Sequence, residues 1–73
     1  MKGELKMYIE KIKEMNIPFI YESYPNKIFI RTIPMFYDMI VSFLSAYSIK
    51  TKRVGHSTFL NIDNTRYIVQ ELY

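Results

Sequence analysis

Apolar residues recur every three or four positions at the start of the chain. They are Leu5, Tyr8, Ile9, Ile12 and Met15, and lysines and glutamates fill the positions between them. This spacing predicts an amphipathic helix over residues 3–15, with an ion pair such as Glu10 and Lys13 on its polar side. Asn16 tolerates a left-handed cap and Pro18 cannot continue a helix, so we expect the helix to end there.

Residues 19–33 change to the two-residue alternation of strands. Aromatic and β-branched residues stand on either side of Pro25 and Asn26, a pair suited to the central positions of a turn. We therefore expect a β-hairpin whose core side carries Ile28, Ile30 and Thr32. Its other side presents Tyr24, Lys27, Phe29 and Arg31.

Pro34 opens a second helical pattern that runs to about Tyr47. Asp38, Ser42 and Ser45 form only a thin polar stripe, so the apolar surface is wider than one sheet requires. We expect a homodimer through this helix, with an interface of Phe36, Met39, Phe43 and Tyr47; the alternative is burial between the sheet and the first helix. Asp38 is interpreted either as an acid stabilised by the helix dipole or as the partner of a cation such as an arginine of another chain.

Three further strands are expected at Ile49–Val54, Thr58–Ile62 and Arg66–Leu72. A two-residue turn at 55–56 sets the pairing of the first two, because a slip of one residue would invert both faces. The core side then carries Ile49, Thr51, Leu60 and Ile62, joined by Tyr67 and Val69. The opposite side carries Lys50, Lys52, Phe59 and Asn61.

A turn at Asn64 and Thr65 would place Asp63 opposite Arg66 as a cross-strand ion pair. The full order, α-β-β-α-β-β-β, predicts an α+β fold: a single two-layer domain over residues 1–73, with an antiparallel sheet covered on one face by both helices. Residues 7–17 can also be laid over residues 39–49, which fits two related α-β-β units followed by a last strand.

The amino-acid composition excludes several kinds of functional site. The chain has 73 residues, one histidine and no cysteine, which leaves no disulfide, no thiolate zinc site and too few nitrogen ligands for zinc. His56 beside Gly55 is typical of a turn, and isolated glycines make no phosphate-binding loop. We therefore expect a non-enzymatic protein without cofactor or metal, in a reducing, cytoplasmic setting. The longest nearly apolar run, 33–47, is too short to span a membrane.

Charge is unevenly distributed, since the net charge of +3 arises downstream of residue 26. The sheet side opposite the core collects cations and aromatic rings, namely Tyr24, Lys27, Phe29, Arg31, Lys50, Lys52 and Phe59, and Arg66 extends this set. Such surfaces are typical of proteins that bind single-stranded nucleic acid, where rings stack on bases and cations contact phosphates. Solubility and cross-strand packing are the alternative explanation.

Two functions follow from these patterns. We expect a small protein-binding module that acts as an inhibitor or adaptor of a larger protein target, because the domain lacks catalytic groups and has surplus apolar surface. The abundance of Ile, Lys, Tyr, Met and Phe is typical of AT-rich genomes, which many phages and other mobile elements share. The alternative is a nucleic-acid-binding protein that uses the basic and aromatic side of the sheet.

Overall fold

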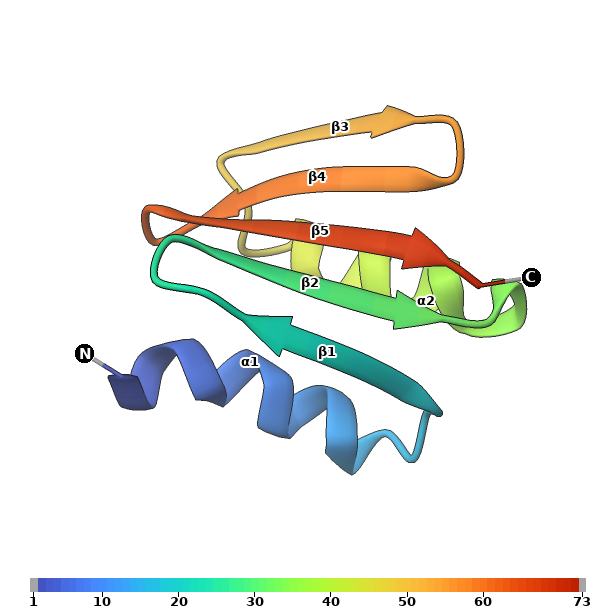
Figure 1. The fold of residues 1–73 in the computed structure, drawn as a ribbon, viewed down its shortest axis with the longest axis horizontal. Helices are drawn as coiled ribbons and strands as arrows, with labels where there is room; N and C mark the ends of the chain where they lie inside the picture. The colour runs from blue at the N-terminus through green and yellow to red at the C-terminus, as the bar shows by residue number, and fades with distance from the viewer. Residues whose placement is uncertain (1, 73) are drawn as a thin grey trace.

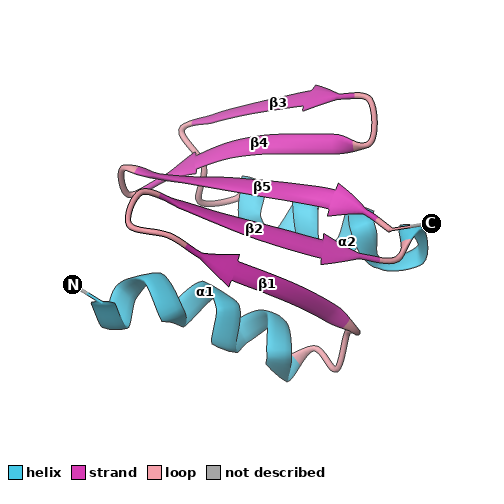
Figure 2. Ribbon diagram, viewed as in Figure 1, coloured by secondary structure: helices cyan, strands magenta, loops and turns pink. Residues whose placement is uncertain are grey.

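The computed structural model of the chain describes the backbone of residues 2–72 and the side chains of residues 7–72. The elements follow one another as α1 (Lys2–Glu14), β1 (Phe19–Ser23), β2 (Lys27–Thr32), α2 (Pro34–Ser45), β3 (Lys50–Val54), β4 (Ser57–Ile62) and β5 (Thr65–Glu71). This is the predicted order of an α+β fold (Figure 2). Within residues 2–72, neither helix is long and apolar enough to cross a membrane.

The strands form one sheet in the order β1-β2-β5-β4-β3 (Figure 1). Neighbouring strands are antiparallel except β2 and β5, which run parallel, with Ile28 opposite Tyr67 and Ile30 opposite Val69. The hairpins β1–β2 and β3–β4 thus flank β5 and point in opposite directions. In strand order alone, β1–β2 and β3–β4 are arranged symmetrically about β5.

The first two hairpin turns are those that the sequence predicts. The Tyr24 N–H donates to the Lys27 carbonyl at 2.8 Å, which leaves Pro25 and Asn26 as the turn residues. Gly55 has φ +62° at the first central position of the β3–β4 turn, as in a type II′ turn. The predicted pairing of Lys52 with Phe59 is confirmed.

The turn between β4 and β5 differs from the prediction by one residue. Its central residues are Asp63 (φ 49°) and Asn64 (φ 62°), because these side chains tolerate positive φ and the β-branched Thr65 does not. Each strand residue keeps its face, since the change moves its partner by two positions. The predicted Asp63–Arg66 ion pair is wrong: the Tyr8 hydroxyl donates to Asp63 Oδ2 at 3.4 Å.

The core lies between the sheet and the helices. α2 runs behind the sheet and α1 lies alongside β1 (Figure 1), and the Tyr8 ring joins them, 6.5 Å from Phe43 and 6.0 Å from Tyr67. Both helices thus pack on the same face. The apolar core cluster among the described residues consists of Tyr8, Ile9, Ile12, Ile17, Ile28, Ile30, Tyr37, Ile40, Leu44, Leu60, Ile62, Tyr67 and Val69.

The prediction that Ile49 faces the core is wrong. β3 begins at Lys50, and the Ile49 side chain is 84% exposed. The Ser48 hydroxyl accepts hydrogen bonds from the backbone N–H groups of Lys50 and Asn61, each at 3.1 Å. The Ile49 N–H donates to the Asn61 carbonyl at 2.9 Å, although Asn61 is already the partner of Lys50. Regular pairing therefore begins only at Lys50. Thr51 is also exposed, since α2 packs on β5 and β4 rather than on β3.

Asp38 lies in the second turn of α2, beyond the first turn where the helix dipole acts. Its side chain is 85% exposed, and its Oδ1 lies 3.9 Å from Arg53 Nη1. The partner of Asp38 is therefore an arginine of its own chain. The predicted pair of Glu10 and Lys13 on α1 is confirmed at 3.5 Å.

Candidate functional site

The sheet face opposite the helices, here called the open face, carries three rows of side chains. Strand pairing alone defines them, because facing residues of adjacent strands share a side. The first row is Lys27, Arg66, Asn61 and Lys50, the second is Glu22, Phe29, Ile68, Phe59 and Lys52, and the third is Ile20, Arg31, Gln70, Ser57 and Val54.

The second row is the apolar centre of the open face. Phe29 and Phe59 lie on either side of Ile68, which is only 6% exposed, and both rings are half-buried. Tyr24 extends this centre, because its ring meets Phe29 edge-on at 5.8 Å and remains 43% exposed. Flat aromatic surface therefore reaches solvent on a face that no helix covers.

Cations surround this centre. Lys27 Nζ lies 5.6 Å from the Phe29 ring centre and 5.9 Å from that of Tyr24. Lys50, Lys52 and Arg66 are exposed, and none of these four cations forms a salt bridge with a residue in the described part of the chain. The open face therefore has a positive potential that its own carboxylates do not cancel.

Arg31 lies on the open face as predicted, but its charge is compensated. Its Nη1 is 3.5 Å from Glu22 Oε1, and its Nε donates to Gln70 Oε1 at 3.2 Å. Arg53 of β3 lies on the helix side of the sheet, with its guanidinium 4.9 Å from the Tyr37 ring centre. These contacts leave the two arginines less available to an outside partner than the four uncompensated cations.

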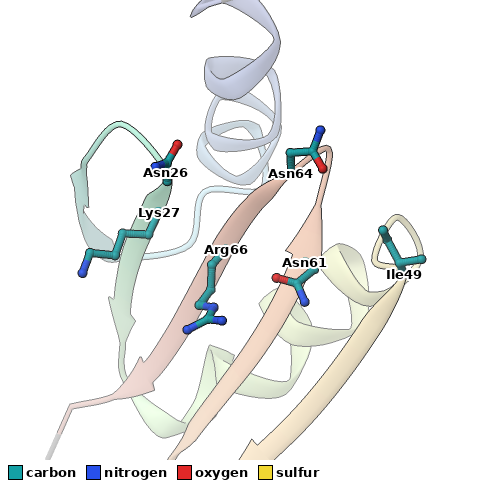
Figure 3. A pocket seen from close by; sticks show the side chains of 6 residues that line it. All are labelled: Asn26, Lys27, Ile49, Asn61, Asn64 and Arg66. Atoms are coloured by element: carbon teal, nitrogen blue, oxygen red, sulfur yellow. The ribbon is translucent and has the colours of Figure 1, made fainter.

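Two adjoining depressions hollow the open face. The first has a volume of about 480 Å³ and is lined by Asn26, Lys27, Ile49, Asn61, Asn64 and Arg66 (Figure 3). The second has a volume of about 280 Å³ and is lined by Lys50, Lys52, Val54, Phe59, Asn61 and Arg66. Asn61 and Arg66 belong to both, so the depressions form one continuous basic surface.

The structure brings most of the predicted binding residues together. Tyr24, Lys27 and Phe29 form one contact cluster, and Lys50, Lys52 and Phe59 line the second depression. Sequence reasoning missed the contributions of Asn26, Asn64, Ile49 and Ile68. Alternation along the strands assigns Asn61 and Arg66 to the open face, but only the strand order places them beside Lys27.

The outer side of α2 is the second candidate surface. Met39 and Tyr47 are 51% and 49% exposed, as an interface requires, and Met35 is 75% exposed. Phe36 and Phe43, predicted for the same interface, are half-buried against the core. Tyr37 is fully buried, so the helix presents its apolar groups to the sheet and to solvent on separate sides.

The described residues outside these two surfaces offer few groups suited to metal binding. Across residues 7–72 no group of three or more histidine, aspartate or glutamate side chains could hold a metal ion. His56 Nδ1 lies 2.9 Å from Glu71 Oε1, at the opposite end of β4 from the first depression. Comparison with protein-family models, with curated proteins and with solved structures finds no match to this chain. What the protein binds is therefore inferred from the open face and from α2.

Proposed function

We propose that the protein binds single-stranded nucleic acid on its open face and catalyses no reaction. The observation that carries this proposal is the combination of four uncompensated cations with the aromatic row. The cations are Lys27, Lys50, Lys52 and Arg66. They surround Phe29 and Phe59, whose rings reach solvent at the centre of the open face.

Each part of this arrangement matches a part of a single strand. Phosphates interact with the lysines and Arg66, while bases stack on the aromatic rings at roughly 1 to 3 kcal/mol per base. A duplex would not expose its base faces to Phe29, Phe59 and Tyr24 in this way. We therefore expect single strands to bind more tightly than duplexes of the same length.

The charge pattern also argues against a role in solubility alone. Surfaces shaped for solubility intersperse both signs of charge, as α1 does where Lys13 pairs with Glu10. On the open face Glu22 pairs with Arg31, and the remaining cations have no such neighbour among the described residues. Lys27 instead lies against the rings of Tyr24 and Phe29.

Salt dependence tests the proposal. Four phosphate contacts predict a slope of log affinity against log salt of about −3, since each contact on a single strand contributes roughly −0.7. Replacing Lys50 and Lys52 with alanine should reduce the slope to about −1.4. We would measure fluorescence anisotropy of a labelled mixed-sequence single strand at several salt concentrations.

The matched control removes two charges from the other side of the molecule. Lys11→Ala combined with Lys13→Ala changes the net charge equally but lies on α1, so the salt slope should stay near that of the unchanged protein. Circular dichroism checks that both variants fold. If the Lys50 and Lys52 variant binds as tightly, with the same salt slope, the open face is not the binding surface.

A protein-binding role, as an inhibitor or adaptor of a larger target, is the second candidate. The observation that favours it is the exposed apolar surface of Met35 and Met39 on α2 and of Tyr47 just after it, since methionine and tyrosine side chains are suited to interfaces. Met39 and Tyr47 also belong to the proposed homodimer interface, together with the half-buried Phe36 and Phe43. This surface lies behind the sheet, so it is separate from the open face (Figure 1).

A further inference from the structure

Three carboxamide side chains line the larger depression of the open face, from Asn26, Asn61 and Asn64. We propose that this depression receives one base of a bound single strand and contacts the hydrogen-bonding edge of that base. The protein would then select the nucleotide at one position and accept any base elsewhere. The inference rests on the proposed function, because it requires a strand on the open face.

A carboxamide is suited to this task because it offers a donor and an acceptor side by side. Base edges present matching pairs of donors and acceptors, which is why asparagine can bind adenine through two hydrogen bonds. Within residues 7–72, the side-chain amides of Asn26, Asn61 and Asn64 form no hydrogen bond with the protein. Their hydrogen-bonding groups are therefore available to a ligand.

Turn geometry explains two of these asparagines but not the third. Asn64 has φ +62° in the β4–β5 turn, and Asn26 is a turn residue between β1 and β2. Asn61 lies within β4, where asparagine is disfavoured relative to β-branched and aromatic residues. It stands between Lys50 and Arg66 in the first row, which places an amide among cations at the boundary of both depressions.

The remaining lining residues fit the other parts of a nucleotide. Figure 3 shows Lys27, Arg66 and Asn61 on neighbouring strands of one face, with Asn26 and Asn64 at the turn end and Ile49 at the β3 side. The cations can contact the phosphate, and the 84% exposed Ile49 offers an apolar surface for the face of the base. The aromatic second row carries no comparable set of amides, so stacking there tolerates any base.

The test compares labelled oligodeoxyadenylate, oligodeoxycytidylate and oligodeoxythymidylate of about twelve residues, within the range of known single-strand site sizes. We expect the unchanged protein to prefer one of them by about fivefold or more, the lower end of what one bidentate base contact supplies. Asn61→Leu keeps the side-chain size but removes the amide, and should reduce this preference to within about twofold. The salt slope should not change, since no charge is removed.

Two further variants keep the test interpretable. Asn64→Gly preserves the positive φ and removes the second amide, so it should lower the preference even if Asn61→Leu were to disturb β4. Ser57→Ala, in the third row outside both depressions, should leave the preference unchanged.

Salt-sensitive binding with equal affinity for all three strands, or a preference that survives loss of both amides, would overturn the base contact alone. Absence of binding at low salt would overturn the proposed function, and the base contact with it.

Discussion

Tyr37 shows how one side chain connects the two layers of the molecule. Its ring is buried, and its hydroxyl shares a hydrogen bond with Thr58 Oγ1 on β4, where Thr58 is also buried. The Arg53 guanidinium covers the ring from outside at 4.9 Å. The contact therefore satisfies two buried polar groups and fixes α2 against the sheet.

Tyr37→Phe removes the hydroxyl and leaves Thr58 Oγ1 without its buried partner. We expect the free energy of unfolding to fall by about 1 to 3 kcal/mol, the usual cost of an unsatisfied buried polar group. Urea denaturation followed by circular dichroism measures this change. Tyr47→Phe makes the same substitution at a half-exposed ring and should have little effect; equal effects of the two variants would show that the Tyr37 hydroxyl contributes nothing of its own.

At the scale of residues, the sequence predicts correctly on which face of the sheet a side chain lies wherever this depends only on alternation along the strand. Phe29, Phe59 and the lysines beside them lie on the predicted side for that reason. It fails at Ile49, because the start of β3 is irregular: the Ile49 N–H bonds to Asn61, the partner of Lys50, and the Ser48 hydroxyl accepts from Lys50 and Asn61. Which side chain replaces a backbone partner depends on local geometry that a hydrophobic pattern does not contain.

At the scale of elements, α2 has two apolar sides with different roles. Tyr37, Ile40 and Leu44 face the core, whereas Met35 and Met39 face solvent. Periodicity predicts the helix well because the signal is local, although the helix ends at Ser45 rather than near Tyr47. A broad apolar helix does not reveal from its sequence which part the sheet covers.

A homodimer through α2 would bury the exposed methionines. We expect light scattering to give twice the chain mass of 8.8 kDa for the unchanged protein. Met39→Lys should return the mass to that of one chain, because a charge at the centre of an apolar interface is costly to desolvate. Ser45→Lys, at an exposed position about a third of a turn around the helix axis from Met39, should leave the mass unchanged. A single-chain mass for the unchanged protein would contradict the dimer.

At the scale of the whole molecule, the binding surface depends on contacts between distant segments. The first depression draws on the β1–β2 and β4–β5 turns, on the residue before β3, and on β2, β4 and β5. The hairpin registers follow from tight turns and could be predicted. The parallel pairing of β2 with β5 joins residues nearly forty positions apart, with Lys27 opposite Arg66, and no turn links them.

Tyr67 links global stability to alkaline pH. Burial, and then the charges of Tyr8 and Asp63, raise the pKa of Tyr67 from 10.0 to about 12 in the folded protein. The folded state therefore holds the Tyr67 hydroxyl proton more tightly than the unfolded state. The contribution of this group to the free energy of unfolding is complete below pH 10 and is lost between pH 10 and 12. The slope is about 1.4 kcal/mol per pH unit in that window.

Urea denaturation at about pH 9 and pH 11 measures this loss, and Tyr67→Phe should show a smaller fall between the two. The comparison uses the difference between the two pH values, because the substitution also removes the hydroxyl and its other contacts. An equal fall in the two proteins would show that the Tyr67 hydroxyl is not responsible.

The central position of β5 also has a consequence during synthesis. β5 follows both hairpins along the chain, so a ribosome releases β1–β2 and β3–β4 before the strand that joins them. Until residues 65–71 emerge, β2 and β4 each have one unpaired edge and the nascent chain cannot complete its sheet. A second nascent chain could supply the missing strand, so crowded translation favours exchange of β5 between copies.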